Sequence, residues 1–216
     1  MIYLYAITEP LDGAAGVTGL AGARVELLST GGVSGAYSAH EELELTADPD
    51  LLWAHEGVVE ALMARATVLP LRFGTTLADV AALRDALDGG RERYGELLQR
   101  LRGRVELAVR VVDASSPEPE SPGDGSRYLA DRLATRREGR LAEEQIHAPL
   151  ARLAAASESA VAPAAGTLLR GAYLVETGEV DRFARRVREL QSGHPDLQVS
   201  CTGPWAPYSF VGNGSA

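Results

Sequence analysis

Five histidine and glutamate side chains form the cluster with the clearest potential for chemistry, namely His40, Glu41, Glu42, His55 and Glu56. Imidazole and carboxylate groups together can hold a divalent metal ion or transfer protons. The common helical zinc motif places two histidines one turn apart, and no such pair occurs around His55. Such residues are more often structural, so a metal-binding enzyme that uses His40, His55 and Glu56 is an alternative and not the favoured hypothesis.

The glycines after the first predicted strand do not form a phosphate-binding loop. Gly13, Gly16, Gly19 and Gly22 recur at every third position, which is the wrong spacing for a dinucleotide-binding turn. The terminal lysine of a P-loop is missing, because the chain contains no lysine. No G-x-S-x-G sequence indicates a nucleophilic serine. We therefore predict no catalytic residue, no cofactor and no bound metal.

The composition predicts a soluble, cytoplasmic protein. The net charge of −9 over 216 residues argues against a nucleic-acid partner, which requires a concentrated positive surface. No apolar run approaches the roughly 20 residues that span a bilayer, so no membrane partner is expected. The single cysteine, Cys201, cannot form an intramolecular disulfide and is predicted to be a buried thiol.

The elements that must position these side chains divide at a segment rich in proline, serine and glycine. This segment, residues 114–125, contains no large apolar side chain and is predicted to be a linker or flexible loop. It separates an N-terminal domain, residues 1–113, from a C-terminal domain, residues 126–216. Each predicted domain is large enough to hold a small core of its own.

Hydrophobic periodicity predicts strands and helices that do not alternate strictly. In the first domain we expect strands at 2–7, 24–28, 33–38 and 105–112 and helices at 49–65, 76–87 and 94–101. Asp48 and Pro49 give the helix at 49–65 a cap and a favourable first position. In the second domain we expect a long helix from Ser126, interrupted at Pro149, then a strand, a helix and a strand over 168–201. The fold class is therefore α+β, with two small two-layer α/β sandwiches of ferredoxin-like type.

The C-terminal tail is unusual because it combines two prolines with three large aromatic residues, Trp205, Tyr208 and Phe210. A tail that is not tied down is usually polar, whereas these side chains would each bury a large apolar area on a partner. The tail must therefore dock, either on the core of the protein or on another chain, and the first alternative is favoured. The alternation of Tyr208 and Phe210 favours a closing edge strand.

Several segments together resemble the gas vesicle protein F/L family. The most specific are the sequence Leu-Pro-Leu-Arg-Phe-Gly-Thr at residues 69–75 and the ending Gly-Pro-Trp-x-Pro-Tyr-Ser-Phe at residues 203–210. Weaker matches lie at residues 3–7, 55–63, 104–111 and 128–129, in the expected order. Ala206 departs from the proline that the family pattern leads us to expect between Trp205 and Pro207.

The resemblance implies a non-enzymatic accessory role in gas vesicle assembly or nucleation, or a place as a minor shell component. The implied partners are the small hydrophobic gas vesicle structural protein and other accessory proteins, in the cytoplasm and at the gas vesicle. Six residues are candidates for docking on a partner: Leu69, Arg72, Phe73, Trp205, Tyr208 and Phe210. A small-molecule regulatory module remains a further alternative, which rests on fold analogy alone.

Overall fold

The computed structural model describes residues 1–11, 16–46, 48–114, 137–164 and 166–212. The chain forms two compact units: unit 1 comprises Met1–Gly103 and Ala206–Ala216, and unit 2 comprises Arg104–Trp205. This division differs from the expected boundaries at residues 113 and 126. The segment at 104–113 joins unit 2 because it pairs with later strands, and the end of the tail returns to unit 1. The predicted linker, apart from Ala114, lies outside the described residues.

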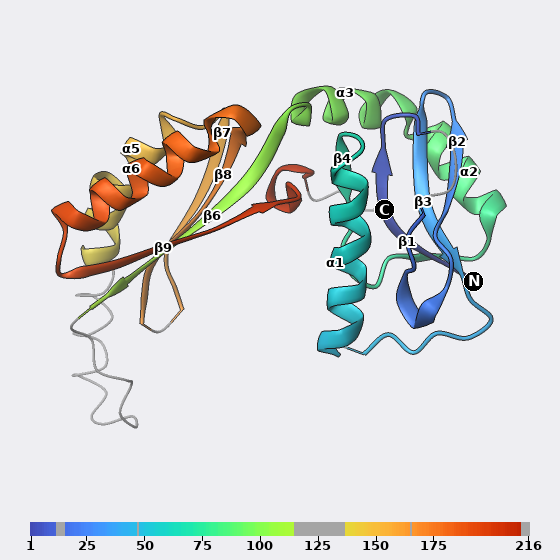
Figure 1. Ribbon diagram of the computed structural model, residues 1–216, viewed down its shortest axis with the longest axis horizontal. Coiled ribbons are helices and arrows are strands. Elements are labelled where there is room, and N and C mark those ends of the chain that lie inside the picture. The colour runs from blue at the N-terminus through green and yellow to red at the C-terminus, as the bar shows by residue number, and fades with distance from the viewer. Residues whose placement is uncertain (12–15, 47, 115–136, 165, 213–216) are drawn as a thin grey trace. The chain divides into compact units, whose positions relative to one another are not determined.

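Unit 1 is built on an antiparallel sheet in the order β2-β3-β1-β4, with β5 also paired to β1 (Figure 1). Its strands are β1 (Ile2–Thr8), β2 (Glu26–Thr30), β3 (Val33–Ala39), β4 (Val68–Pro70) and β5 (Thr76–Leu77). A short 3-10 turn, Leu20–Gly22, lies between β1 and β2. The central strand β1 is buried along its whole length, because both of its edges and both of its faces are covered.

Helices cover both faces of the unit 1 sheet, namely α1 (Pro49–Met63), α2 (Val80–Gly89) and α3 (Arg91–Leu101). Adjacent residues of β3 show this, since neighbouring side chains of a strand point to opposite faces. Ala36 belongs to the core cluster under α1, whereas a Cβ atom on Gly35 would lie 3.1 Å from a methyl group of Leu83 in α2. The predicted cap of α1 forms, because Asp48 accepts a hydrogen bond from the Asp50 amide. The expected helix start at Thr76 is wrong, because Asp79 is the residue that caps α2, by accepting from the Ala82 amide.

Unit 2 has a four-stranded antiparallel sheet in the order β7-β8-β6-β9 (Figure 1). Its strands are β6 (Arg104–Asp113), β7 (Ala156–Ala164), β8 (Thr167–Glu176) and β9 (Leu197–Trp205). The described helical segments are residues 137–142, a π-helical stretch at Glu143–His147, α5 (Ala148–Ala151), a 3-10 turn at Thr177–Glu179 and α6 (Val180–Gly193). The π-helical stretch directly precedes the segment of Pro149, which has no N–H for a regular helical bond.

The core of unit 2 lies on one face of its sheet. Phe183 and Val187 of α6 pack with Val109 and Val111 of β6 and with Tyr173 of β8, all of them buried. The alternate residues of these strands, such as Arg110 and Arg170, point to the other face and are exposed. One helical layer on one sheet therefore makes a two-layer unit, and much of the opposite face of the sheet is exposed, although Leu174 on that face is buried.

The α+β class is confirmed. The helix expected at 76–87 begins only at Val80, because Thr76–Leu77 form β5, and two further elements differ from the sequence-based expectation. Strand β7 was not predicted, because apart from Val161 its residues are small or polar and lack the β-branched and aromatic side chains typical of strands. The end of the tail forms a 3-10 turn, Tyr208–Phe210, and not an edge strand. Among the described residues, no helix combines the length and apolar character needed to cross a membrane.

Candidate functional site

The C-terminal tail docks on unit 1, which was the favoured of the two alternatives. Ala206, Pro207 and Phe210 are buried, and Ala206 and Tyr208 belong to the cluster beneath α1. The hydroxyl group of Tyr208 donates a hydrogen bond to Glu56 Oε1 at 2.8 Å. The last aromatic residues of the chain therefore complete the core of unit 1.

His55 of α1 connects this tail to β1 and to the loop after β4. Its Nδ1 lies 2.8 Å from the Tyr3 hydroxyl, and its Nε2 lies 3.0 Å from the Leu71 carbonyl and 3.2 Å from the Tyr208 hydroxyl. Because a carbonyl oxygen only accepts, we assign the proton to Nε2, so that Nδ1 accepts from Tyr3. Burial lowers the pKa of His55 to about 4, although the bond to Leu71 acts in the opposite direction. The imidazole is therefore neutral at pH 7.

Aromatic rings surround the His55 imidazole. Tyr5 stacks on it with ring centroids 5.6 Å apart, while Tyr3 and Phe73 meet it edge-on at 5.7 and 6.0 Å. This environment explains the neutral state, since a charged imidazole would lose its hydration among apolar groups. The His55 cluster, defined as Tyr3, Tyr5, His55, Phe73 and Tyr208, is thus a packed structural centre with all of its polar groups bonded.

The geometry of the histidines does not favour a metal site. His40 Nε2 lies 2.7 Å from the Ser38 hydroxyl, and both ring nitrogens of His55 already have partners. Within the described ranges, no group of three or more histidine, cysteine, aspartate or glutamate side chains is placed to hold a metal ion. Glu56 instead accepts the hydrogen bond of Tyr208. The alternative based on His40, His55 and Glu56 therefore gains no support from these contacts.

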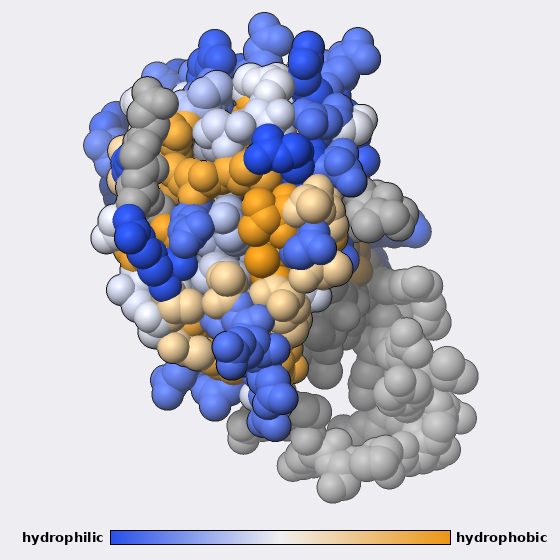
Figure 2. Space-filling model, turned by 90° about the vertical axis from the view of Figure 1, so that its right-hand side faces the viewer, coloured by the Kyte–Doolittle hydropathy of each residue, from blue (hydrophilic) through white to orange (hydrophobic). Residues whose placement is uncertain are grey.

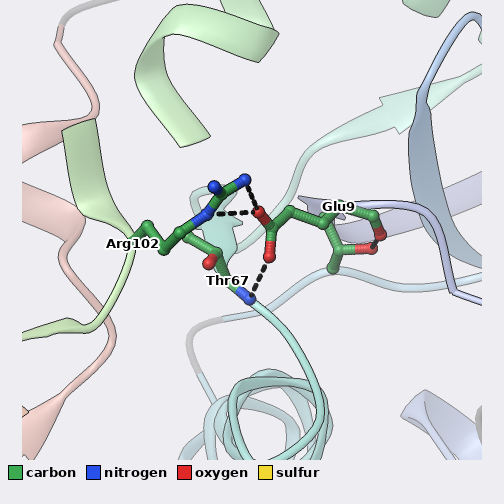
Figure 3. A network of polar contacts seen from close by, with 4 residues as sticks. Glu9, Thr67 and Arg102 are labelled. Atoms are coloured by element: carbon green, nitrogen blue, oxygen red, sulfur yellow. Dashed lines mark hydrogen bonds and ion pairs between the residues drawn. The ribbon is translucent and has the colours of Figure 1, made fainter. Parts of the chain in front are cut away.

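A second polar network fixes the end of α3 to β1 and is drawn in Figure 3. The Arg102 guanidinium donates from Nε and Nη2 to Glu9 Oε1, the first at 2.9 Å, and the Thr67 amide donates to Glu9 Oε2 at 3.4 Å. Burial acts to raise the pKa of Glu9, but these hydrogen bonds outweigh it and lower the pKa below 4.5. The network holds the chain just before it leaves unit 1 at Gly103.

The six predicted docking residues differ in burial and belong to different units. Leu69 in β4 and Phe210 in the tail are buried at 3% exposure, and Phe73 and Tyr208 are half-buried in the His55 cluster. Arg72 is exposed on unit 1. Trp205 is 45% exposed and ends β9 of unit 2, where its Nε1 donates to Thr202 Oγ1 at 3.3 Å. Only Arg72 and Trp205 are thus accessible in a substantial way.

Exposed apolar side chains also occur at positions that the sequence analysis did not single out. In unit 1 these are Met1, Leu52 and Trp53, of which Trp53 is 67% exposed. In unit 2, Leu141 is exposed in addition to Trp205. Figure 2 shows one side of the molecule, on which apolar residues gather centrally among hydrophilic ones. A surface hollow of about 310 Å³ lies by the N-terminus, lined by residues that include Ile2, His40 and Val80. Nothing in this hollow identifies a ligand, so it does not favour a regulatory module.

The profile of one protein family, described as gas vesicle synthesis protein GvpL/GvpF, matches residues 1–212 of this chain. The protein belongs to the GvpL/GvpF family. Gas vesicle protein L of Streptomyces sp. is 34% identical over 249 residues, a match that covers 97% of this chain and 92% of that protein. Gas vesicle protein F2 of Halobacterium salinarum is 29% identical and is covered to 91%.

Solved structures of GvpL/GvpF proteins share the fold. The crystal structure of GvpF from Anabaena sp. PCC7120 has a TM-score of 0.83 at 22% identity and covers 99% of this chain. That of GvpF from Microcystis aeruginosa has a TM-score of 0.78 at 20% identity and covers 98%. Membership of the family gives the protein a gas vesicle related role, as the resemblance of residues 69–75 and 203–210 implies.

Proposed function

We propose that this protein is a non-enzymatic accessory protein of gas vesicle assembly, which acts by binding the small hydrophobic gas vesicle structural protein. Its role is to promote nucleation or growth of the shell, or to be a minor shell component, with other accessory proteins as further partners. The name of the family, gas vesicle synthesis protein, supports a part in gas vesicle formation. Its place of action would be the cytoplasm and the vesicle surface.

The observation that carries this proposal is the exposure of Trp205. A tryptophan has a large apolar surface, and here 45% of the residue remains in contact with water. Its position in unit 2 is fixed, because Trp205 ends β9 opposite Glu106 of β6 and the Thr202 hydroxyl accepts from the indole. A rigid exposed aromatic residue loses little entropy on binding, and such residues dominate many protein interfaces.

Retention of the gas vesicle structural protein on the immobilised full-length chain tests the proposal. We expect the wild type to retain it and the Trp205→Ala variant to bind about thirtyfold more weakly, as for a loss of about 2 kcal/mol. Trp53→Ala is the matched control, because Trp53 is even more exposed but lies on the helix α1.

Two results would count against the proposal. The first is wild-type retention no greater than that of an unrelated acidic protein. The second is equal binding by the wild type and Trp205→Ala, which would leave Trp205 without a role. Thermal unfolding of each variant shows whether a loss of binding reflects a loss of folding.

A further inference from the structure

The open face of the unit 2 sheet places two arginines directly opposite each other. Arg110 of β6 pairs with Arg170 of β8, and both residues are exposed. Like charges at opposed positions destabilise an antiparallel pair of strands. Among the ion pairs of the described residues, none involves either guanidinium, and Arg110 donates instead to Thr167 Oγ1 at 3.1 and 3.2 Å. Two positive charges are thus gathered on a chain whose net charge is −9.

Apart from Glu158, the surface beside the arginines is made of small side chains. Val109 of β6 and Cys201 of β9 point toward the helices of unit 2, so the alternate residues point to the open face. In the row next to the arginine pair, Ala108 lies between Ala172 and Thr202, and the exposed Glu158 of β7 lies beyond Ala172. Small side chains allow another polypeptide to approach the sheet closely.

Trp205 borders the same face. Its indole nitrogen donates to Thr202 Oγ1 at 3.3 Å, and the Thr202 side chain points to the open face. Thr202 is two residues along β9 from Ser200, which pairs with Arg110, a separation of about 7 Å. Along this face, Trp205 is followed by a row of small residues with Glu158 at its β7 end, and then by the arginine pair.

We propose that this face, the Arg-Trp face formed by Ala108, Arg110, Arg170, Ala172, Thr202 and Trp205, binds an acidic segment of the gas vesicle structural protein. Carboxylates of that segment pair with Arg110 and Arg170, and an apolar side chain packs on Trp205. The inference rests on the proposed function and adds the chemistry of the contact.

The chemistry of the face supports this occupant. Guanidinium groups bind carboxylates in a bidentate manner, and opposing carboxylates remove the repulsion within the arginine pair. A long polyanion such as a nucleic acid is disfavoured by the negative charge of the chain as a whole.

Charge reversal on the full-length protein tests the Arg-Trp face. The test variant is Arg110→Glu/Arg170→Glu, and the control is Arg185→Glu/Arg188→Glu on the exposed surface of α6. Both double variants change the net charge equally. The test variant replaces one like-charged pair by another but loses the hydrogen bonds from Arg110 to Thr167 Oγ1, so thermal melting of each variant checks that it is folded. The probe is the purified gas vesicle structural protein, offered to each immobilised variant.

We expect the test variant to bind about tenfold more weakly than the wild type, and the control less than twofold. Equal binding by all three proteins would overturn the inference and leave the proposed function intact. An equal loss of binding in both double variants would also overturn the inference, since a general effect of net charge would then explain the loss. Absence of wild-type binding would refute the proposed function itself. If melting shows that the test variant is unfolded, Arg110→Gln/Arg170→Gln replaces it, with the same expected direction.

Discussion

Protonation of His55 is expected to make unit 1 sensitive to mild acid. The imidazole is 1% exposed, and its pKa falls from 6.5 to about 4 because burial disfavours the charged form. In the unfolded chain this histidine takes up a proton near pH 6.5, while in the folded chain it stays neutral until about pH 4. Unfolding therefore becomes more favourable as the pH falls through this window, and the effect is complete below about pH 4.

The magnitude follows from the gap between the two pKa values. One pKa unit corresponds to about 1.36 kcal/mol, so the gap between 6.5 and about 4 corresponds to about 3 kcal/mol of stability present at pH 7.5 and lost at pH 4. That loss is a large share of the stability of an ordinary domain. His55 thus acts as a structural group whose neutral state is required by the tail, Tyr3 and Leu71.

Comparison with His55→Gln isolates this contribution. The glutamine amide can still donate to the Leu71 carbonyl but does not titrate, so the variant is less stable at pH 7.5 through lost packing. Carboxylates and the other histidines titrate alike in both proteins. Urea unfolding followed by circular dichroism from pH 7.5 to 4 should show the stability difference between wild type and variant shrinking by about 3 kcal/mol. A difference that stays constant over this range would refute the reasoning.

Three further changes test the packing of unit 1. Phe210→Ala should reduce the free energy of unfolding by about 3 to 5 kcal/mol, because Phe210 is 3% exposed, whereas an equal loss in Trp205→Ala would contradict their different burial. Gly19→Ala should lower the melting temperature, because a Cβ atom there would overlap the Tyr5 hydroxyl. Gly57→Ala, with no atom within 4 Å of the new Cβ, should not lower it. Glu9→Gln should cost about 1 kcal/mol at pH 7 in urea unfolding. Because the pKa of Glu9 is lowered, that difference should persist above its ordinary pKa and vanish as the pH falls through the folded value.

Local sequence signals were sufficient for elements whose causes are local. Asp48 and Pro49 predicted the start of α1, and the Asp48 carboxylate does accept from the Asp50 amide. Alternating apolar residues predicted β1, which is buried throughout. The strand β7 escaped prediction because its pairing with β8, and not the propensity of its residues, holds it in the sheet.

The domain boundaries could not be derived from composition. A segment rich in proline, serine and glycine has the same composition whether it joins two domains or forms a loop within one. The strand before residues 114–125 pairs with β8 after them, with Arg104 opposite Glu176 and Val111 opposite Leu169. This pairing joins residues tens of positions apart, and such long-range register leaves no mark within either segment.

The burial of the candidate site residues also depends on long-range contacts that the sequence does not show. Phe73 and Tyr208 were both predicted to dock, but their common partner, His55, lies between them only in the folded chain. Trp205, three residues before Tyr208, belongs to the other unit and remains exposed. The aromatic pattern of the tail therefore predicted that docking occurs, but burial of each ring depends on contacts that the pattern does not contain.

The order of the chain makes unit 2 an insertion within unit 1, and this has a consequence for the tail. Unit 1 lacks Ala206, Tyr208 and Phe210 until all of residues 104–205 have been synthesised. Before that point Glu56 has no Tyr208 hydroxyl to accept from, and the cluster beneath α1 is incomplete. Trp205 itself is positioned within unit 2, because it ends β9 opposite Glu106 of β6 and its indole donates to Thr202 Oγ1. The core of unit 1, in contrast, is completed only after the whole of unit 2 has been synthesised.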